Sequence, residues 1–221
     1  MIEGVGHHNR LSTIQEIKSL SPEAVLEKTQ RVRESFIGIP IHKGLDGYPY
    51  SPFPLTDGPI HPTLVEDMAD LLIYHGNFEG ADLLVSEGDR GGGLLAQAIG
   101  SKTGIPIALA NWHKEIPVDM PDVIIVEAKV GFSGSGHVVI RGIQSGQKVI
   151  VVDDLLSTGG TVGALIGAII KAGATVEQAF FVGEKINMGG RDRIAKRFPD
   201  VRVTSLVKFI AEGEFTTEAN E

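Results

Sequence analysis

Cysteine is absent from the 221 residues of this chain, which excludes a disulfide framework and any metal site built on thiolates. The chain also lacks an apolar run of about 18 residues, the length that indicates a membrane-spanning helix. It lacks a basic and then apolar amino terminus of the kind that marks a secretory signal. The sequence therefore predicts a protein without membrane partners, and its composition is compatible with a cytoplasmic location.

Clustered positive charge is missing as well. The formal net charge is −8, and no stripe of Lys and Arg stands out, so a nucleic-acid-binding surface is not expected. A polyanionic ligand must then be met by local cations or by a metal ion. The length fits one large domain or a domain with a small subdomain, and a hydrophobic content of 42% is enough for its core.

The most informative segment, residues 148–163, reads KVIVVDDLLSTGGTVG. Val149 to Val152 is a β-branched apolar run, which predicts a strand buried on both faces of a parallel sheet. Asp153 and Asp154 follow directly, and a helix is expected over residues 162–171. Ligands of open α/β sheets bind at the carboxyl ends of the strands, where this segment would lie.

The loop that follows the two carboxylates has the composition of an anion cradle. Its glycines allow a ligand to approach the backbone, and N–H groups at the start of the helix add to the hydroxyl groups. It is not a Walker A loop, because no Lys-Ser/Thr pair follows the glycines. Carboxylates repel phosphate, so we expect the acidic pair to face sugar hydroxyls or bound Mg²⁺. The residues of the cradle are Ser157, Thr158, Gly159, Gly160 and Thr161.

A second combination of strand, loop and helix follows the same plan earlier in the chain. A buried strand is expected over residues 81–85 and a helix over 94–101, with SEGDRGGG between them at 86–93. Arg90 in this loop offers a forked cation suited to a diphosphate. A solvated arginine in a glycine-rich turn is the alternative.

The order of residues at 148–163 resembles the phosphoribosyl-pyrophosphate (PRPP) motif of type I phosphoribosyltransferases. The resemblance extends over residues 36–210, where segments 39–41 and 54–58 are similar to the base-binding hood of archaeal-type purine enzymes or to the junction of that hood with the core. It implies an α/β fold with a mostly parallel central sheet, flanking helices, a small hood and a flexible flap. We accordingly expect an amino-terminal helical arm at 1–35, the transferase domain with its hood at 36–211, and a disordered tail at 212–221.

The resemblance implies an enzyme, a pentosyltransferase, that transfers the phosphoribosyl group of PRPP to a purine base and releases pyrophosphate, as in purine salvage. The acidic pair would hold the ribose hydroxyls, directly or through Mg²⁺, the implied cofactor, which it would bind directly or through water. The cradle at 157–161 would hold the 5′-phosphate, and Glu87 and Gly88 would add to the PRPP site. With Mg²⁺, Arg90 and Lys114 would neutralise the departing pyrophosphate. The predicted catalytic residues are thus Asp153, Asp154, Arg90 and Lys114, and a homodimer is implied as well.

Residues 115–137 resemble the flap that closes over PRPP in this family. We expect hairpin arms at 123–126 and 138–140 and a flexible glycine-rich tip at 131–136. Such a lid excludes water from the reacting ribose. His113, next to Lys114, occupies a position where many relatives carry Arg, so its role is open.

The purine would be bound by the segment that follows a strand expected at 176–182. The Glu184-Lys185 pair and the Gly-Gly-Arg sequence at 189–191 look like the purine-contacting segment of xanthine and adenine phosphoribosyltransferases. An ammonium group donates hydrogen bonds and cannot accept them, so Lys185 favours a 6-oxopurine (hypoxanthine, guanine or xanthine) over adenine. A surface lysine paired with Glu184 or Glu212 is the alternative.

Two other functions stay open at this stage. The first is the same transfer to adenine. The second is a non-catalytic regulator that senses PRPP or nucleotides, although residues 1–35 are too few for a convincing winged DNA-binding module. In human-type hypoxanthine-guanine enzymes an Asp stands at the position of Ser157. The proton on purine N7 would therefore be handled by Asp154, Glu127, Glu184 or a water molecule.

Overall fold

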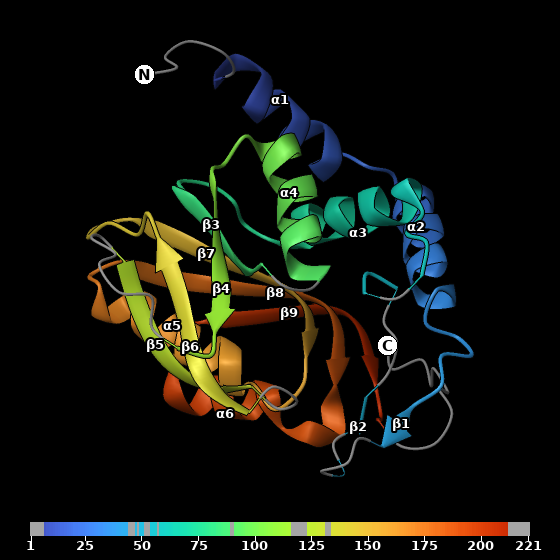
Figure 1. Ribbon diagram of the computed structural model, residues 1–221. Helices are drawn as coiled ribbons and strands as arrows, with labels where there is room; N and C mark the ends of the chain where they lie inside the picture. The colour runs from blue at the N-terminus through green and yellow to red at the C-terminus, as the bar shows by residue number, and fades with distance from the viewer. Residues whose placement is uncertain are drawn as a thin grey trace.

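The computed structural model describes residues 7–43, 47, 49–50, 54–56, 58–88, 91–115, 123–130 and 134–211. In this part of the chain a seven-stranded sheet has the order β5-β6-β4-β3-β7-β8-β9 (Figure 1). The parallel strands are β3 (Leu83–Glu87), β4 (Ile107–His113), β7 (Lys148–Leu156), β8 (Thr175–Lys185) and β9 (Arg202–Phe209). An antiparallel hairpin of β5 (Val123–Val130) and β6 (Gly134–Arg141) extends the sheet beyond β4. The prediction of a mostly parallel central sheet is confirmed.

Helices cover both faces of this sheet (Figure 1). One layer contains α1 (His7–Lys18), α2 (Pro22–Glu34), α3 (Pro62–His75) and α4 (Gly91–Thr103), and the other contains α5 (Gly160–Lys171) and α6 (Gly190–Arg197). A small antiparallel pair, β1 (His42–Lys43) with β2 (Pro49–Tyr50), lies near the ends of β8 and β9 (Figure 1). A short 3₁₀ helix covers Ile186–Met188. None of the described helices is both long enough and apolar enough to cross a bilayer.

The core consists of two apolar layers separated by the sheet. In β7, Ile150 and Val152 belong to the layer that α3 and α4 cover, whereas Val149 and Val151 belong to the layer that α5 covers. All four side chains are buried, so the predicted strand with two buried faces is confirmed. Each such side chain contributes about 1.5–3 kcal/mol of transfer free energy. β7 is the middle one of the five parallel strands, with β4 and β3 on one side and β8 and β9 on the other.

Several elements differ from the sequence prediction at their ends. β4 extends to His113, because residues 111–113 pair with β6. Residues 134–136, expected in a flexible tip, are paired in β6 with residues 128–130 of β5, so that part of the prediction is wrong. The rest of the expected tip and the predicted tail at 212–221 lie outside the described residues.

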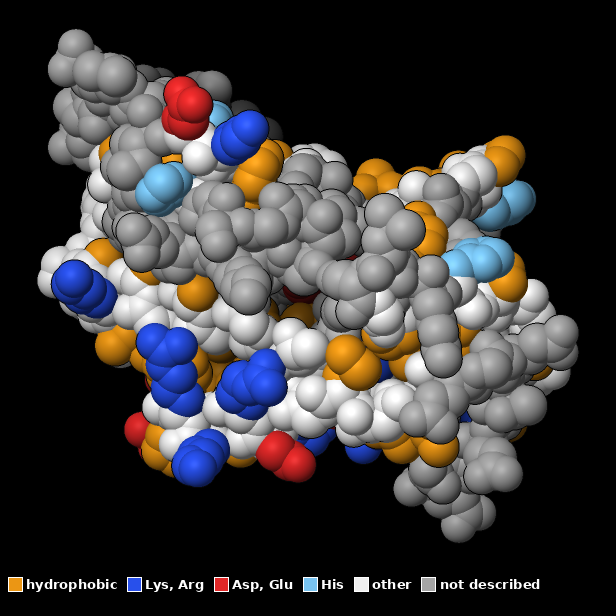
Figure 2. All heavy atoms as spheres, turned by 60° about the horizontal axis from the view of Figure 1, so that its bottom comes forward, with side chains coloured by type: hydrophobic (Ala, Val, Ile, Leu, Met, Phe, Trp, Pro, Cys, Tyr) orange, Lys and Arg blue, Asp and Glu red, His pale blue; other side chains and the backbone are white. Residues whose placement is uncertain are grey.

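Figure 2 shows one face of the molecule. Several Lys and Arg side chains gather at its lower left, and acidic side chains lie beside them. A polyanionic ligand on this face would therefore meet local cationic groups rather than a continuous basic stripe.

The predicted amino-terminal arm is packed into the main core. Val32 of α2 and Phe36 just beyond it are buried in the layer that α3 also forms. On α3, Asp67 is 1% exposed and binds Lys28 Nζ at 2.8 Å and Arg31 Nε at 2.7 Å. Burial by itself would raise the pKa of Asp67, but the hydrogen bonds from Arg31 and Lys28 outweigh it and hold that pKa below its usual range. Ion pairs as well as apolar contacts therefore hold the amino-terminal arm against α3.

Replacing Asp67 with Asn removes the negative charge that Lys28 and Arg31 share. We expect the free energy of unfolding at pH 7, measured by urea denaturation, to fall by about 2–3 kcal/mol. The folded-state pKa lies below the unfolded-state value of about 3.9, so this contribution is complete above that value and is lost as the pH falls through the folded-state pKa. The difference between wild type and variant should therefore shrink in strong acid.

Glu66 provides the control for this experiment, because it is an exposed neighbour on the same helix. Glu66→Gln should change the free energy of unfolding by less than about 0.5 kcal/mol. Equal losses in the two variants would contradict the structural role of Asp67.

Candidate functional site

The candidate site lies where β3, β7 and β8 end. β3 and β7 are parallel neighbours, with Leu83 opposite Val149 and Val85 opposite Val151, so the loops that leave these strands are side by side. α4 follows β3 and α5 follows β7, which places the starts of both helices at one edge of the sheet. This is the edge at which ligands of open α/β sheets bind.

The backbone at the start of α4 presses against the two aspartates of β7. A Cβ atom placed on Gly92 would lie 2.6 Å from Oδ1 of Asp153, and one on Gly91 would lie 2.9 Å from Oδ2 of Asp154. Both distances are too short for a real Cβ atom, so the two positions require glycine. α4 therefore begins at Gly91 instead of the predicted residue 94, and the glycines of the expected loop form its first turn.

Negative charge is concentrated at the ends of β3 and β7. Asp154 is 4% exposed, and its backbone N–H donates to Oδ1 of Asp153 at 2.9 Å. Burial raises the pKa of Asp153 well above its ordinary value, and the negative charges of Asp154 and Glu87 raise it further. Such a cluster is stabilised by hydrogen-bond donors or by a cation, which suits sugar hydroxyls or a metal ion.

The predicted anion cradle connects β7 to α5. β7 ends at Leu156 and α5 begins at Gly160. Gly159 is the N-cap of α5, with a φ of 71° in the left-handed region that favours glycine. Because Gly159 has no side chain, it cannot occupy the N–H groups in the first turn of α5. Those groups and the positive end of the helix dipole can act on a bound anion, and Ser157 and Thr158 are half-buried beside them.

A contact that the sequence pattern does not predict holds the cradle in place. A Cβ atom on Gly190, the first residue of α6, would collide with the carbonyl oxygen of Ser157, and one on Gly159 would lie 2.9 Å from the carbonyl oxygen of Gly190. The guanidinium group of Arg193 donates a hydrogen bond to the carbonyl oxygen of Thr158. The glycine pair at 189–190 indicates that another backbone segment can approach closely. The segment that does so, residues 157–159, lies about 30 residues earlier in the chain.

The other predicted PRPP ligands lie around β3 and β4. A Cβ atom on Gly88 would lie 2.5 Å from Oδ1 of Asn111 on β4, so Asn111 is a candidate site residue that the sequence did not single out. Lys114 directly follows β4 and is exposed, and His113 is the last residue of that strand. Arg90 lies outside the described residues.

Glu184 and Lys185 are the last residues of β8, and both are buried. Burial would raise the pKa of Glu184, but hydrogen bonds from Arg191 and Ser205 hold it below the usual range, with Arg191 Nε 2.9 Å from Oε1. Lys185 is 1% exposed and donates from Nζ to the carbonyl oxygen of Pro49 in β2 at 2.5 Å. The alternative of a surface lysine is therefore wrong, and Lys185 joins the sheet to the predicted hood.

An α/β domain of this kind, with an acidic pair between two glycine-rich loops at the ends of parallel strands, is built to bind a phosphorylated sugar or a nucleotide. Residues 89–217 match the family model of the phosphoribosyl transferase domain, which is more than half of the chain. The hypoxanthine/guanine phosphoribosyltransferase of Methanocaldococcus vulcanius is 32% identical over 171 residues, which cover 76% of this chain and 88% of that protein. The protein of the same name from Ferroglobus placidus is 34% identical over 163 residues, which cover 73% of this chain and 82% of that protein.

The fold is shared with solved structures as well. The adenine phosphoribosyltransferase of Saccharomyces cerevisiae, solved with an imino-altritol bisphosphate and adenine, superimposes with a TM-score of 0.66 at 21% identity. The match covers 82% of this chain and 99% of that chain. The present chain therefore belongs to the phosphoribosyltransferase family, and it is a PRPP-dependent transferase.

Substituting Gly92 with Ala tests the contact between α4 and Asp153. The added Cβ would displace Asp153 or Ser86, whose Oγ lies at the same distance of 2.6 Å. A misplacement of this size is expected to slow PRPP-dependent transfer by about 100-fold. The initial rate of transfer is the measurement, and the melting temperature shows whether the variant is folded. Gly93→Ala is the matched control, because its Cβ would meet nothing closer than 3.5 Å, and a Gly92→Ala enzyme as active as this control would contradict the assignment.

Arg193 gives a separate test of the cradle. Arg193→Ala removes the hydrogen bond to Thr158, which is worth about 1 kcal/mol, so we expect the KM for PRPP to rise about three- to tenfold. The KM for the base should stay nearly constant, because Arg193 contacts the cradle. Lys196→Ala, an exposed change on the same helix, should leave both constants unchanged; an equal rise of both in Arg193→Ala would argue against a role specific to the cradle.

Proposed function

We propose that the enzyme transfers the 5-phosphoribosyl group of PRPP to a purine base, with a 6-oxopurine as the favoured acceptor, and releases pyrophosphate. The observation that carries this proposal is the meeting of two glycine-rich loops at one acidic pair, with Lys185 buried at the end of the neighbouring strand. The names of the M. vulcanius and F. placidus relatives support the same class of acceptor.

Three parts of PRPP correspond to three parts of the site. The 5′-phosphate would lie in the cradle at 157–161, at the start of α5. The ribose hydroxyls would donate to Asp153 and Asp154, where they offset the burial and the charge repulsion that together raise the pKa of Asp153. The pyrophosphate would face the loop between β3 and α4, with Glu87 and Gly88 nearby. We propose Arg90 and Lys114 as the cations that neutralise it as it leaves.

Magnesium fits this site as an ion held jointly with the substrate. Within the described part of the chain, no group of three or more His, Cys, Asp or Glu side chains is arranged to hold a metal. Mg²⁺ is commonly bound by one or two carboxylates together with substrate phosphates, and a cation would relieve the crowding of carboxylates around Asp153. We infer that Asp153 and Asp154 hold Mg²⁺ together with PRPP, directly or through water, and that the ion offsets charge on the pyrophosphate.

The position of Lys185 supports a 6-oxopurine. Its ammonium group lies between the end of β8 and β2, and an ammonium group is a donor that suits the 6-oxo oxygen and not the 6-amino group of adenine. Adenine is the alternative acceptor. The likeness to the yeast adenine enzyme, at 21% identity, speaks for the fold and not for the base.

The N7 proton of the purine needs a carrier at this site. Glu184 is poorly suited, because its ion pair with Arg191 lowers its pKa and keeps it charged. Asp154, Glu127 and a water molecule are the carriers that we propose. A homodimer and a cytoplasmic location are further proposals, and both rest on the family resemblance.

A panel of bases tests the proposed acceptor. Nucleotide formation is measured with PRPP, Mg²⁺ and one base at a time: hypoxanthine, guanine, xanthine, adenine, orotate and uracil. We expect turnover of one or more 6-oxopurines. Turnover of adenine alone would replace the favoured acceptor by the alternative. No turnover with any base, while PRPP still raises the melting temperature, would indicate a regulator.

Lys185→Met tests the role of the ammonium group. We expect kcat/KM for hypoxanthine to fall about 10- to 100-fold, the value of a hydrogen bond to a charged group, while the PRPP-induced rise in melting temperature persists. Lys208→Met is the matched control, because Lys208 is exposed on the adjacent strand. Unchanged hypoxanthine turnover in Lys185→Met would refute the assignment.

A further inference from the structure

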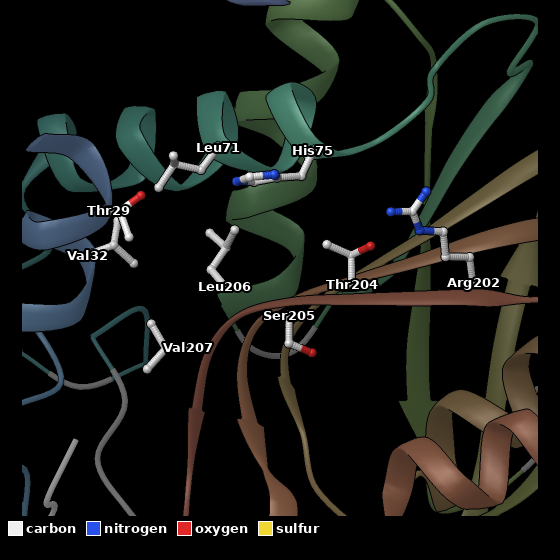
Figure 3. Close-up of a pocket in the computed structure, with 9 residues that line it drawn as sticks. All are labelled: Thr29, Val32, Leu71, His75, Arg202, Thr204, Ser205, Leu206 and Val207. Carbon is white, nitrogen blue, oxygen red and sulfur yellow. The ribbon is translucent and has the colours of Figure 1, made fainter. Parts of the chain in front are cut away.

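A second cavity lies on the sheet edge opposite the β5–β6 hairpin, between α2, α3 and β9. It has a volume of about 210 Å³ and is lined by nine residues, all drawn in Figure 3. Arg202 is the first residue of β9 and His75 is the last residue of α3. The cavity is therefore separate from the candidate site, which follows the carboxyl ends of β3, β7 and β8.

One end of this cavity is apolar and the other is cationic. Val32, Leu71 and Leu206 line the apolar end, and Arg202 stands at the other end, while the imidazole ring of His75 lies between them and points toward Leu71 (Figure 3). Thr204 lies on β9 between Leu206 and Arg202, with its hydroxyl toward Arg202 (Figure 3). Among the residues that the structure describes, no acidic side chain lines the cavity.

The cationic end has an excess of positive charge. Burial lowers the pKa of His75, and the positive charges of Lys18 and Arg202 lower it further. Lys18 is engaged by the end of α3, where its Nζ donates to the carbonyl oxygens of Tyr74 and Gly76. Within the described chain, Arg202 has neither an acidic side chain within ion-pair distance nor a hydrogen-bond acceptor. Its guanidinium group is available to an anion.

The chemistry of the two ends defines the ligand. A guanidinium group binds a carboxylate through two parallel N–H bonds, and the apolar end favours hydrocarbon over water. A dry engineered cavity of about 150 Å³ is large enough for benzene, so the present volume suits a single ring or a short chain. We propose that this cavity binds a small carboxylic acid with an apolar body, its carboxylate on Arg202 and its body against Leu71 and Leu206.

A ligand in this position would join the arm to the core. Thr29 and Val32 belong to α2, Leu71 and His75 to α3, and the remaining lining residues to β9. Occupation would therefore add contacts between α2 and β9 that exist in the folded state and not in the unfolded chain. Binding should raise the melting temperature, independently of PRPP.

Benzoate is the probe, and isothermal titration of the full chain without PRPP is the measurement. Benzyl alcohol has the same ring without the charge, and sulfate has charge without the ring. We expect saturable binding of benzoate, with binding of both comparison compounds weaker by tenfold or more. A second readout is the pKa of the His75 imidazole, measured by NMR, which should rise when a carboxylate offsets the neighbouring positive charges.

Arg202→Gln is the test variant and Lys171→Gln is its control, since Lys171 is an exposed cation on α5 in the opposite layer. The first should weaken benzoate binding by tenfold or more and the second by less than twofold, while both still bind PRPP. Equal benzoate affinity in Arg202→Gln and wild type would overturn the proposal. The absence of any saturable benzoate binding would also overturn it, as would benzyl alcohol binding as tightly as benzoate. Sulfate that binds as tightly as benzoate and raises the pKa of His75 equally would overturn it too.

Discussion

The close approach of the α4 backbone to Asp153 and Asp154 is the constraint on which the site depends. It arises because β3 and β7 are parallel neighbours in register, so that the chain leaving β3 must pass the side chains at the end of β7. Glycine at positions 91 and 92 makes the passage possible. Asp154 is buried and Asp153 is half-buried against this backbone, and the mutual repulsion of the two carboxylates favours a ligand that brings hydroxyl groups or a cation.

The proposed phosphate-binding and base-binding parts of the site are both held in place by α6. The first turn of α6 lies against the cradle through Gly190 and Arg193, and Arg191 in the same turn binds Glu184 at the end of β8. Lys185, next to Glu184, then connects β8 with β2. A single short helix therefore fixes the position of the cradle proposed for the 5′-phosphate relative to the proposed purine-binding residues, and a transfer reaction requires such positioning to within about an ångström.

The amino-terminal arm belongs to the same folded unit. Asp67 on α3 is buried and is paired with Lys28 and the more exposed Arg31 of α2, and Val32 and Phe36 enter the main apolar layer. Removing one member of such a buried group leaves uncompensated charge, so the arm and the core are expected to unfold together. The cavity that ends at Arg202 is a consequence of this packing, because α2 forms one of its walls.

Local pattern in the sequence was enough to predict the buried strand β7, the acidic pair that it carries and the loop and helix that follow it, because strand burial and loop composition depend on neighbouring residues. Contacts between distant residues were decided by the tertiary structure. Glycine at 91 and 92 indicates a loop until Asp153 and Asp154 are placed beside it. The alternative of a surface position for Lys185 is excluded only when β2 is placed beside it. The partner of Ser157 and Gly159, namely Gly190, is set by how α6 packs on the sheet. Such contacts join residues that are far apart in the sequence. They depend on how the helices and strands pack, which no short stretch of sequence specifies.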